Sequence, residues 1–461
     1  MARIEAKCGL FQVSRGLALL AGASALSAQG IFTLPASDPA GIARSGAGVA
    51  FGRSLEAASL NPALLVTLAD RLNVFLSGGQ EFQSAQDTLE SNQRINYTTD
   101  RNRVLPAFGL GWSYNKKVAL GLKVDSPFLR HGLFGPATTT RFMGDEISLE
   151  ARRVEFQVAV ALKDSVSLGF GVGVARIDYA SGAALRAVVP VDPASPVGGS
   201  NPALGLMEVR VREEGQVTVP SASFGLRWAI NPRWTFGFAY QGPLQGDVKL
   251  RASYGDREPT YVATDGLGVP PLGISAQGTA LKGLSTPTAG KERIQLPARA
   301  SLGLRHRSNN VFTWEVDLRY LDGAKLQLPG PAGLRTPGGQ VSNPSSPYAG
   351  QRSLGLSLMG ELAIGKAWTV RAGMSLDQAL REDALLEPLL GGARSAGFSG
   401  GVAYRLGRGE LSLGYQVRQS QDVDSSTLDG VWSITGYRPT GTRTRIENSG
   451  HVYALGYKVS F

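Results

Sequence analysis

The stretch that decides the fold is Val311-Phe-Thr-Trp-Glu-Val-Asp-Leu-Arg-Tyr320. Apolar side chains occupy every even position from Phe312 to Tyr320, and polar side chains occupy every odd position from Thr313 to Arg319. Successive side chains of a β-strand point to opposite faces, so this pattern predicts a strand with one apolar and one polar face. Such a strand separates an apolar environment from a polar one.

Comparable alternation recurs along the chain, in segments that begin near residues 118, 166, 224, 368 and 411. A soluble β-sandwich would alternate as well. The tryptophans favour a membrane protein, because every tryptophan except Trp432 lies within five residues of a short connection. Tryptophan gathers at membrane–water interfaces, so we expect an all-β protein that forms a transmembrane barrel rather than a sandwich.

The connections alternate between short turns and long loops. Short turns lie at residues 115–117, 163–165, 231–233, 308–310, 365–367 and 407–409, and long loops lie near residues 83–103, 127–147, 180–206, 255–290, 323–350, 380–393 and 420–449. These six turns and seven loops connect fourteen antiparallel strands. Outer-membrane barrels have this pattern, with the short turns facing the periplasm. One strand slips in phase near Pro220, where we expect a bulge.

The two ends of the chain are typical of an exported barrel. Residues 1–28 combine the basic side chains of Arg3, Lys7 and Arg15 with an apolar stretch, as in a secretory signal peptide. The only cysteine, Cys8, lies within this segment, so the mature chain has no disulfide. The last strand ends at Phe461, which resembles the signal that the barrel assembly machinery recognises. We therefore expect the protein in the bacterial outer membrane.

The net charge of +10 would be compatible with nucleic-acid binding. The basic residues form neither a run nor a helical stripe, however, and an exported protein does not meet nucleic acid. A basic lumen, or a basic rim facing the phosphates of outer-membrane lipid and lipopolysaccharide, explains the charge better. We expect no nucleic-acid partner.

Residues 29–70 separate the signal peptide from the first strand and show little alternation. They are rich in glycine and alanine and are too polar and too interrupted to form membrane strands. A barrel of fourteen strands has room for a small plug in its lumen. We therefore expect residues 29–70 to form a plug, or hatch, inside a barrel formed by residues 71–461.

The hatch segment carries a resemblance to a known family. Residues 41–48, Gly-Ile-Ala-Arg-Ser-Gly-Ala-Gly, followed by residues 61–64, Asn-Pro-Ala-Leu, resemble the N-terminal hatch of FadL/TodX-type outer-membrane transporters. The motif residues are Gly46, Gly48, Asn61, Pro62 and Ala63. The resemblance covers the mature chain except the long loops. It implies a monomeric fourteen-stranded barrel that carries long-chain fatty acids or aromatic hydrocarbons.

The resemblance also implies a route, in which the ligand diffuses to an internal pocket near the hatch N-terminus and leaves through a gap in the third strand. Here the third strand is expected at residues 118–125 and is interrupted by Ser126, Pro127 and Phe128. Proline donates no hydrogen bond to the sheet, so a wall opening at Pro127 is physically reasonable. Alternatively, Pro127 only begins an external loop, and the sequence leaves both interpretations open.

A ligand pocket of this kind would include the early hatch residues Ile31, Phe32 and Leu34. Their apolar side chains would contact the ligand, and a carboxylate ligand would need a basic partner. Alternation places six basic candidates on the lumenal face: Lys123, Arg227, Arg305, Arg319, Arg371 and Arg405. Each could instead pair with an acidic residue such as Glu315 or Asp317, because buried charges are costly when alone.

Signals of catalysis are weak. The sequence Gly397-Phe-Ser-Gly-Gly401 matches G-x-S-x-G but lies in an alternating segment, whereas a nucleophile elbow needs a strand–turn–helix. The three histidines are dispersed, and no metal or cofactor motif is present. We expect a transporter without enzymatic activity or cofactor. The alternatives are an adhesion barrel whose loops bind a partner, and an open porin, which a plugged lumen argues against.

Overall fold

The computed structural model describes residues 38–51, 55–68, 70–89, 94–98, 103–133, 146–190, 204–256, 291–329, 350–380, 394–420, 423–425 and 444–461. Within these residues no helix is long and apolar enough to cross a bilayer. The predicted signal peptide and the pocket candidates Ile31, Phe32 and Leu34 lie outside the described residues.

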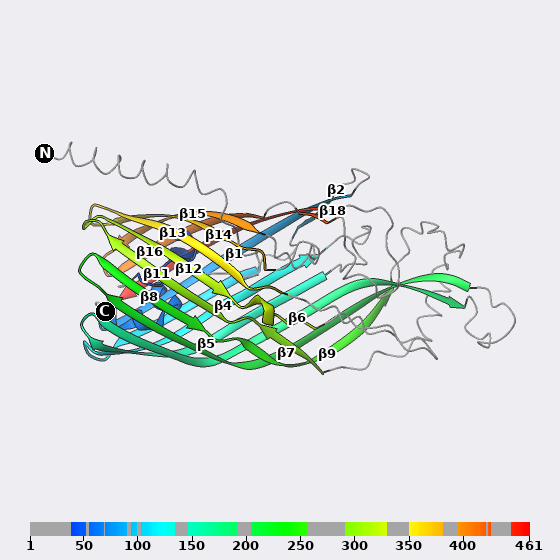
Figure 1. The fold of residues 1–461 in the computed structure, drawn as a ribbon, viewed down its shortest axis with the longest axis horizontal. Helices are drawn as coiled ribbons and strands as arrows, with labels where there is room; N and C mark the ends of the chain where they lie inside the picture. Colours follow the sequence, from blue (N-terminus) through cyan, green and yellow to red (C-terminus); the bar gives the residue numbers. More distant parts are fainter. Residues whose placement is uncertain are drawn as a thin grey trace.

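The strands form one closed antiparallel barrel (Figure 1). Their bounds are β1 Leu72–Leu89, β2 Arg94–Thr98, β3 Arg103–Ser113, β4 Val118–Leu133, β5 Glu146–Lys163, β6 Val166–Pro190, β7 Leu204–Ala229, β8 Trp234–Gln241, β9 Leu244–Asp256, β10 Lys291–Leu296, β11 Arg299–Arg307, β12 Phe312–Leu321, β13 Ser353–Ile364, β14 Trp368–Asp377, β15 Ser395–Leu406, β16 Gly409–Ser420, β17 Val423–Ser425 and β18 Thr444–Ser460. Closure comes from the pairing of β1 with β18. Four spans consist of two segments each (β2/β3, β8/β9, β10/β11 and β16/β17), so the barrel has fourteen strands, as predicted.

The short turns lie at one end of the barrel, on the left in Figure 1, together with the C-terminus. Three of them are closed by an asparagine side chain. The Oδ1 atoms of Asn115, Asn231 and Asn309 each accept two backbone N–H bonds from residues two and three positions later. In two others Gly365 and Gly407 adopt positive φ angles of 63° and 61°. These are the residue types that tight hairpin turns require.

At the opposite end the strands extend further than alternation predicted. The expected loop near residues 180–206 is mostly a hairpin, because β6 continues to Pro190 and β7 begins at Leu204. The predicted start of the loop near residues 127–147 is wrong, because β4 continues to Leu133. These extensions carry mixed polar sequences, and alternation of apolar and polar residues cannot reveal a strand that leaves the membrane.

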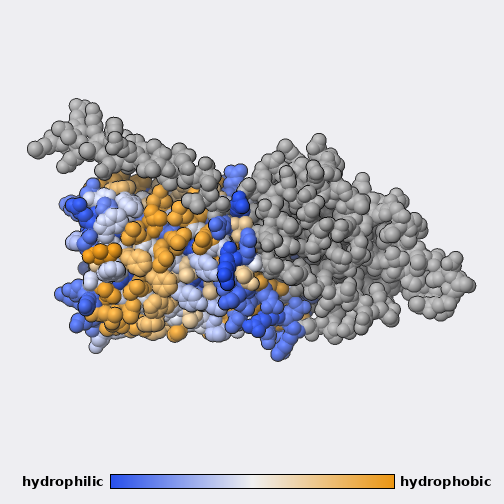
Figure 2. Space-filling model, in the orientation of Figure 1, coloured by the Kyte–Doolittle hydropathy of each residue, from blue (hydrophilic) through white to orange (hydrophobic). Residues whose placement is uncertain are grey.

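The outer face carries an apolar band that continues from strand to strand (Figure 2). On β5 and β6 the outward side chains near the turns are apolar, as in Phe156 and Val172, which are about half exposed. Nearer the loops the pattern inverts: the outward Arg152 is polar, and the inward Leu149 and Ile177 are fully buried. The inversion marks the level at which the wall leaves the lipid, because lipid-facing positions must be apolar.

A break in strand pairing lies at this level between β8/β9 and β10/β11. The β8–β11 ladder ends at Gln241↔Arg299 and the β9–β10 ladder begins at Leu244↔Leu296, so residues 242–243 and 297–298 pair in neither. Nearby, β7 pairs with β6 without interruption across Pro220. On its other edge β7 pairs first with β9 and then with β8, and the register shifts by one residue between the two. The irregularity expected near Pro220 therefore lies on the edge of β7 that faces β8 and β9.

Residues 38–68, which we call the hatch segment, fill the lumen on the turn side. They comprise α2 (Pro39–Ala43), α3 (Leu55–Leu60) and the 3-10 helix η1 (Pro62–Thr67). Most of their described side chains are buried against the barrel wall. Inward-facing glycines make room for them. A Cβ atom at Gly169 would lie 2.3 Å from the Ala63 nitrogen, and one at Gly414 would lie 2.2 Å from the Pro39 carbonyl oxygen.

Candidate functional site

The glycines of the first hatch motif form a turn that binds two wall carboxylates. Gly46 and Gly48 have φ angles of 77° and 144°, which favour glycine. The turn directs the N–H groups of Gly48 and Val49 at the Asp317 carboxylate, at 2.8 and 3.2 Å. The next N–H group, that of Ala50, donates to Glu315 at 2.7 Å. Both carboxylates therefore hold the hatch rather than pair with a lumenal arginine.

The second motif anchors the hatch to β7, which is separated from β12 by β8 and β11. The Asn61 side-chain amide donates to the carbonyl oxygens of Val49 at 2.7 Å and Leu226 at 3.0 Å. Its Oδ1 accepts from the Ala63 N–H group, and Pro62 begins η1. Asn61 is completely buried. The Asn61 side chain thus connects two segments of the hatch to each other and to β7.

Above the hatch, toward the loops, the inner wall is apolar. The buried side chains there form one cluster, the aliphatic cluster: Phe128, Ile147, Leu149, Ala151, Ala175, Ile177, Tyr179, Val219, Leu244, Val248, Leu250, Ile294, Leu296, Leu321, Leu326, Leu328 and Leu380. It draws on β4 to β7, β9, β10 and β12. An apolar interior of this kind attracts apolar ligands and offers little to ions.

The wall beside this cluster is interrupted at the third span. The β3–β4 ladder ends at Phe108↔Val124, and β4 has one extra residue opposite β5 at Ser126–Pro127. Every residue from Ser126 to Arg130 is buried, so beyond the bulge neither face of β4 lies against lipid. Phe128 belongs to the aliphatic cluster, and Leu129 belongs to a buried cluster with Ile42 of α2 and Val452 and Ala454 of β18. Pro127 therefore lies within a strand and does not begin a loop.

Two of the predicted basic residues lie in buried ion pairs. The Lys123 Nζ atom donates to the Ser59 carbonyl oxygen of α3 at 3.0 Å and lies 3.3 Å from the Glu155 carboxylate. Arg319 pairs with Asp377 of β14. The Lys123 contacts connect the hatch to the wall, and the Arg319 pair connects two strands of the wall. Both side chains have structural partners where the sequence suggested a ligand.

The other four predicted basic residues lie together. Arg227, Arg305, Arg371 and Arg405 line one cavity of about 390 Å³ at the short-turn end, together with Phe51 and Thr67 of the hatch segment. The Arg305 guanidinium lies over the Phe51 ring, 4.7 Å from its centroid. Arg371 contacts the Glu361 carboxylate at 2.8 Å. This cavity is on the opposite side of the hatch from the aliphatic cluster.

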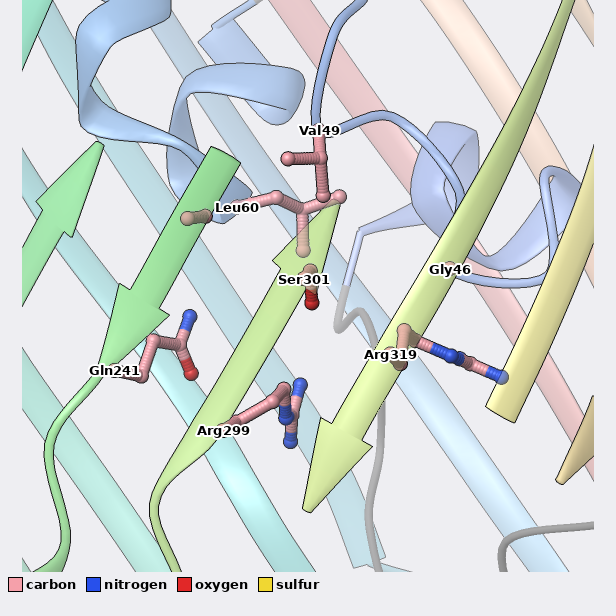
Figure 3. A pocket seen from close by; sticks show the side chains of 8 residues that line it. Gly46, Val49, Leu60, Gln241, Arg299, Ser301 and Arg319 are labelled. Atoms are coloured by element: carbon pink, nitrogen blue, oxygen red, sulfur yellow. The ribbon is translucent and has the colours of Figure 1, made fainter. Parts of the chain in front are cut away.

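Sequence reasoning missed Arg299, although it shares the inward parity of Arg305. Arg299 is buried at the start of β11, directly below Leu296 of the aliphatic cluster. Its Nη2 atom has no hydrogen-bond partner among the described residues. Figure 3 shows it beside Gln241 and Ser301 in a pocket of about 10 Å³, which is room for one water-sized group. Buried guanidinium groups normally have partners, so this one marks a candidate binding position.

The catalytic motif considered in the sequence serves the hatch. Ser399 of the G-x-S-x-G sequence lies in β15, and its hydroxyl donates to the Ala43 carbonyl oxygen at 2.9 Å. The His306 ring lies tilted against Trp234 of β8, with ring centroids 4.4 Å apart. Among the described residues no group of three or more histidine, cysteine or acidic side chains could hold a metal ion.

Comparison with known proteins agrees with this architecture. Residues 18–461 match the model of the family described as outer membrane protein transport protein (OMPP1/FadL/TodX). The chain belongs to this family. No curated protein matches it closely enough to be counted. Membership of the OMPP1/FadL/TodX family places the protein in the outer membrane and in a family of transport proteins.

Solved structures similar to this OMPP1/FadL/TodX family member share its fold. A Pseudomonas aeruginosa FadL homologue is 21% identical with a TM-score of 0.70, covering 93% of this chain and 99% of its own. The Ralstonia pickettii toluene transporter TbuX is 16% identical with a TM-score of 0.58, covering 92% and 98%. The Pseudomonas putida toluene transporter TodX is 13% identical, with the same TM-score and coverage.

Proposed function

We propose that this protein takes up hydrophobic small molecules across the outer membrane by passive diffusion through the barrel wall. One observation carries the proposal: the aliphatic cluster occupies the lumen between the loops and the hatch and includes Phe128, which lies at the interrupted β4. An apolar ligand would enter from the loop end and gain free energy by leaving water. The hatch segment blocks the way straight through.

The route we propose leaves the lumen sideways. Beyond Val124 the edges of β3 and β4 are not paired with each other, although β4 stays paired with β5. A closed barrel in lipid normally satisfies every backbone group within the sheet, so such an interruption needs a reason. Passage of a ligand from the aliphatic cluster into the bilayer supplies one. Ser126, Pro127 and Phe128 would line this opening.

Two substrate classes fit the aliphatic cluster, namely long-chain fatty acids and aromatic hydrocarbons. We propose Arg299 as the residue that distinguishes them. It lies below the cluster and has an Nη2 atom without a partner among the described residues, so one carboxylate oxygen that reached it would accept a strong charge-assisted hydrogen bond. A neutral hydrocarbon would gain nothing from it. This arrangement favours an acid with an aliphatic chain.

Further parts of the proposal concern the surroundings. We propose that residues 1–28 are removed as a signal peptide, that residues 29–70 form the hatch, and that residues 71–461 form the barrel. The barrel assembly machinery would recognise the strand ending at Phe461, whose N–H group donates to the Leu72 carbonyl oxygen at 2.8 Å. The monomer would contact lipid and lipopolysaccharide and would have no enzymatic activity. No observation favours an adhesion role.

The proposal is tested by uptake in cells that lack the gene, with the wild-type gene or a variant restored. Labelled long-chain fatty acid and labelled toluene serve as probes. We expect fatty-acid uptake to follow the wild-type gene and to fall about tenfold in Arg299→Gln, as expected for loss of one charge-assisted bond. Toluene uptake should be equal in wild type and variant. Uptake of neither probe in wild-type cells would contradict the transport function.

A further inference from the structure

The cavity at the short-turn end takes no part in the proposed uptake route. It lies between the hatch and the turns, whereas the aliphatic cluster lies beyond the hatch toward the loops. Its wall combines residues of β7, β8 and β11 to β16 with Lys458 of β18, and hatch residues Phe51 and Thr67 lie beside it. Apolar side chains are rare in this lining, so an apolar ligand has little to contact.

The charge of this cavity is strongly unbalanced. Seven basic side chains line it against two carboxylates, those of Glu361 and Glu410. Both carboxylates contact the same side of the cavity: Glu361 lies 2.8 Å from Arg371, and Glu410 lies 3.5 Å from Arg371 and 3.1 Å from Lys458. The remaining basic side chains are Arg227, Arg233, Arg305, Arg307 and Arg405. The lining therefore carries more basic than acidic side chains, on both facing parts of the wall.

Two of these arginines contact neutral groups. Arg305 is stacked on the ring of Phe51. The Arg307 Nη2 atom donates to the side-chain oxygen of Asn310 at 3.0 Å. An amide orients a guanidinium without cancelling its charge. Arg233 and Arg405 are exposed to the cavity from the two facing parts of the wall, at the β7–β8 turn and on β15.

A concave surface of one charge inside a low-dielectric wall concentrates the electric field and attracts counter-ions. Arginine is suited to this task because its fork binds carboxylate and phosphate oxygens in pairs. A volume of about 390 Å³ matches small-molecule sites and is too small for a folded partner. We propose that this cavity is a binding site for a small multivalent anion that carries carboxylate or phosphate groups.

A bound anion would hold the two sides of the barrel mouth and the hatch together. Arg227 and Arg233 approach the cavity from the β7–β8 side, and Arg371 and Arg405 approach it from β14 and β15. An anion between them relieves the repulsion of like charges and connects the two sides of the barrel mouth under the hatch. Because Phe51 and Thr67 belong to the hatch segment, an occupied site also stabilises the hatch in the lumen.

Isothermal titration calorimetry of the full chain in detergent at low salt tests the proposal, with citrate and inorganic pyrophosphate as probes. We expect saturable binding to the wild type. The double variant Arg233→Gln/Arg405→Gln should bind about tenfold more weakly. A matched control is Lys366→Gln/Arg408→Gln, which removes two charges from turns at the same end but outside the cavity lining and should bind as the wild type does.

Two outcomes would overturn the site. One is the absence of saturable binding by the wild type, and the other is equal weakening in both double variants, which would indicate general charge attraction. If the cavity variant does not fold, the wild type alone decides the question: citrate should raise its unfolding temperature more than sodium chloride of equal ionic strength. Equal effects of the two salts would overturn the proposal. None of these readouts depends on uptake of a hydrophobic substrate.

Discussion

Strand pairing fails in two parts of this barrel, and proline is present at both. Between β3 and β4 the ladder ends at Phe108↔Val124, just before Pro106 on one strand and Pro127 on the other. Between β8/β9 and β10/β11 the unpaired residues include Pro243 and Pro297. In the second case pairing resumes at once. In the first case β4 and β3 never pair again within the described residues.

The comparison shows that proline alone does not open a barrel wall. At the second break both strands change inward parity together: Leu244 and Leu296 point inward beyond the break, whereas Gln241 and Arg299 point inward before it. The two strands thus remain in register, and only the assignment of faces changes. At the first break only β4 gains a residue, so it departs from β3 alone. β3 and β4 separate because only β4 gains a residue, and not because proline removes a hydrogen-bond donor.

The largest expected effect comes from making the first break resemble the second. Deleting Pro127 leaves one residue opposite Arg152, and combining the deletion with Pro106→Val restores a donor on β3. If the opening carries the substrate, uptake should fall more than about tenfold, because a closed ladder leaves no lateral path. Uptake by whole cells measures this, with the amount of folded barrel checked by its resistance to detergent at low temperature.

The control for this experiment is Pro243→Val/Pro297→Val, which restores two donors at the second break. Its uptake should equal that of the wild type, because the ladders on both sides of that break are already continuous. Wild-type uptake by the chain with the closed first break would contradict the lateral route. Loss of uptake in the control would show that both breaks carry substrate.

A smaller effect tests whether the second break marks the edge of the lipid. Leu302 faces outward on β11 on the turn side of the break and is 42% exposed, whereas Gln245 faces outward just beyond the break. Leu302→Arg should lower the free energy of unfolding by about 2 kcal/mol, as expected for arginine in the hydrocarbon layer. Gln245→Arg should cost less, about 1 kcal/mol, because it stays in water and loses only the hydrogen bond from Arg293 at 3.1 Å. Urea unfolding in lipid vesicles measures both, and equal costs would refute this boundary.

Alternation predicted the barrel well because lipid imposes it. The number of strands, the short turns and the inward faces follow from a wall with lipid outside and a filled lumen inside, as on β12 from Phe312 to Leu321. The prediction weakened where lipid stops. Beyond the inversion level the inward side becomes apolar, so the continuation of β4 past Pro127 and of β6 to Pro190 had no simple pattern to reveal it.

The candidate site was less predictable because parity reports the face of a side chain and not its height or its partners. Lys123 and Arg227 both point inward, yet one is paired at the hatch and the other lines the basic cavity. Arg299 had the correct parity. Its significance depends on the absence of a partner for Nη2 among the described residues, which only the folded structure reveals. The hatch motif was readable because its glycines and asparagine have local conformational roles.

The smallest expected effect concerns the hatch helix beside the first break. Asp38 caps α2, accepting the Gly41 N–H group at 2.6 Å, and Ile42 of this helix shares a buried cluster with Leu129 of β4. Burial raises the pKa of the Asp38 carboxyl above its ordinary value, and the Arg44 guanidinium only partly offsets this. The hatch should therefore lose stability as pH rises from roughly 4, the ordinary aspartate pKa, through the raised value.

Asp38→Asn keeps an N-cap of equal quality and removes the ionisation, so it should abolish this pH dependence and change stability by less than about 1 kcal/mol. Hydrogen-exchange protection of the amides in residues 40–43 measures it, after correction for the intrinsic rates at each pH. The amides of β10 at the second break provide the reference, because they lie away from Asp38 and should respond alike in both proteins. An identical pH dependence in wild type and variant would assign the effect to another group. A loss of it confined to α2 would show that Asp38 makes the hatch beside the first break sensitive to pH.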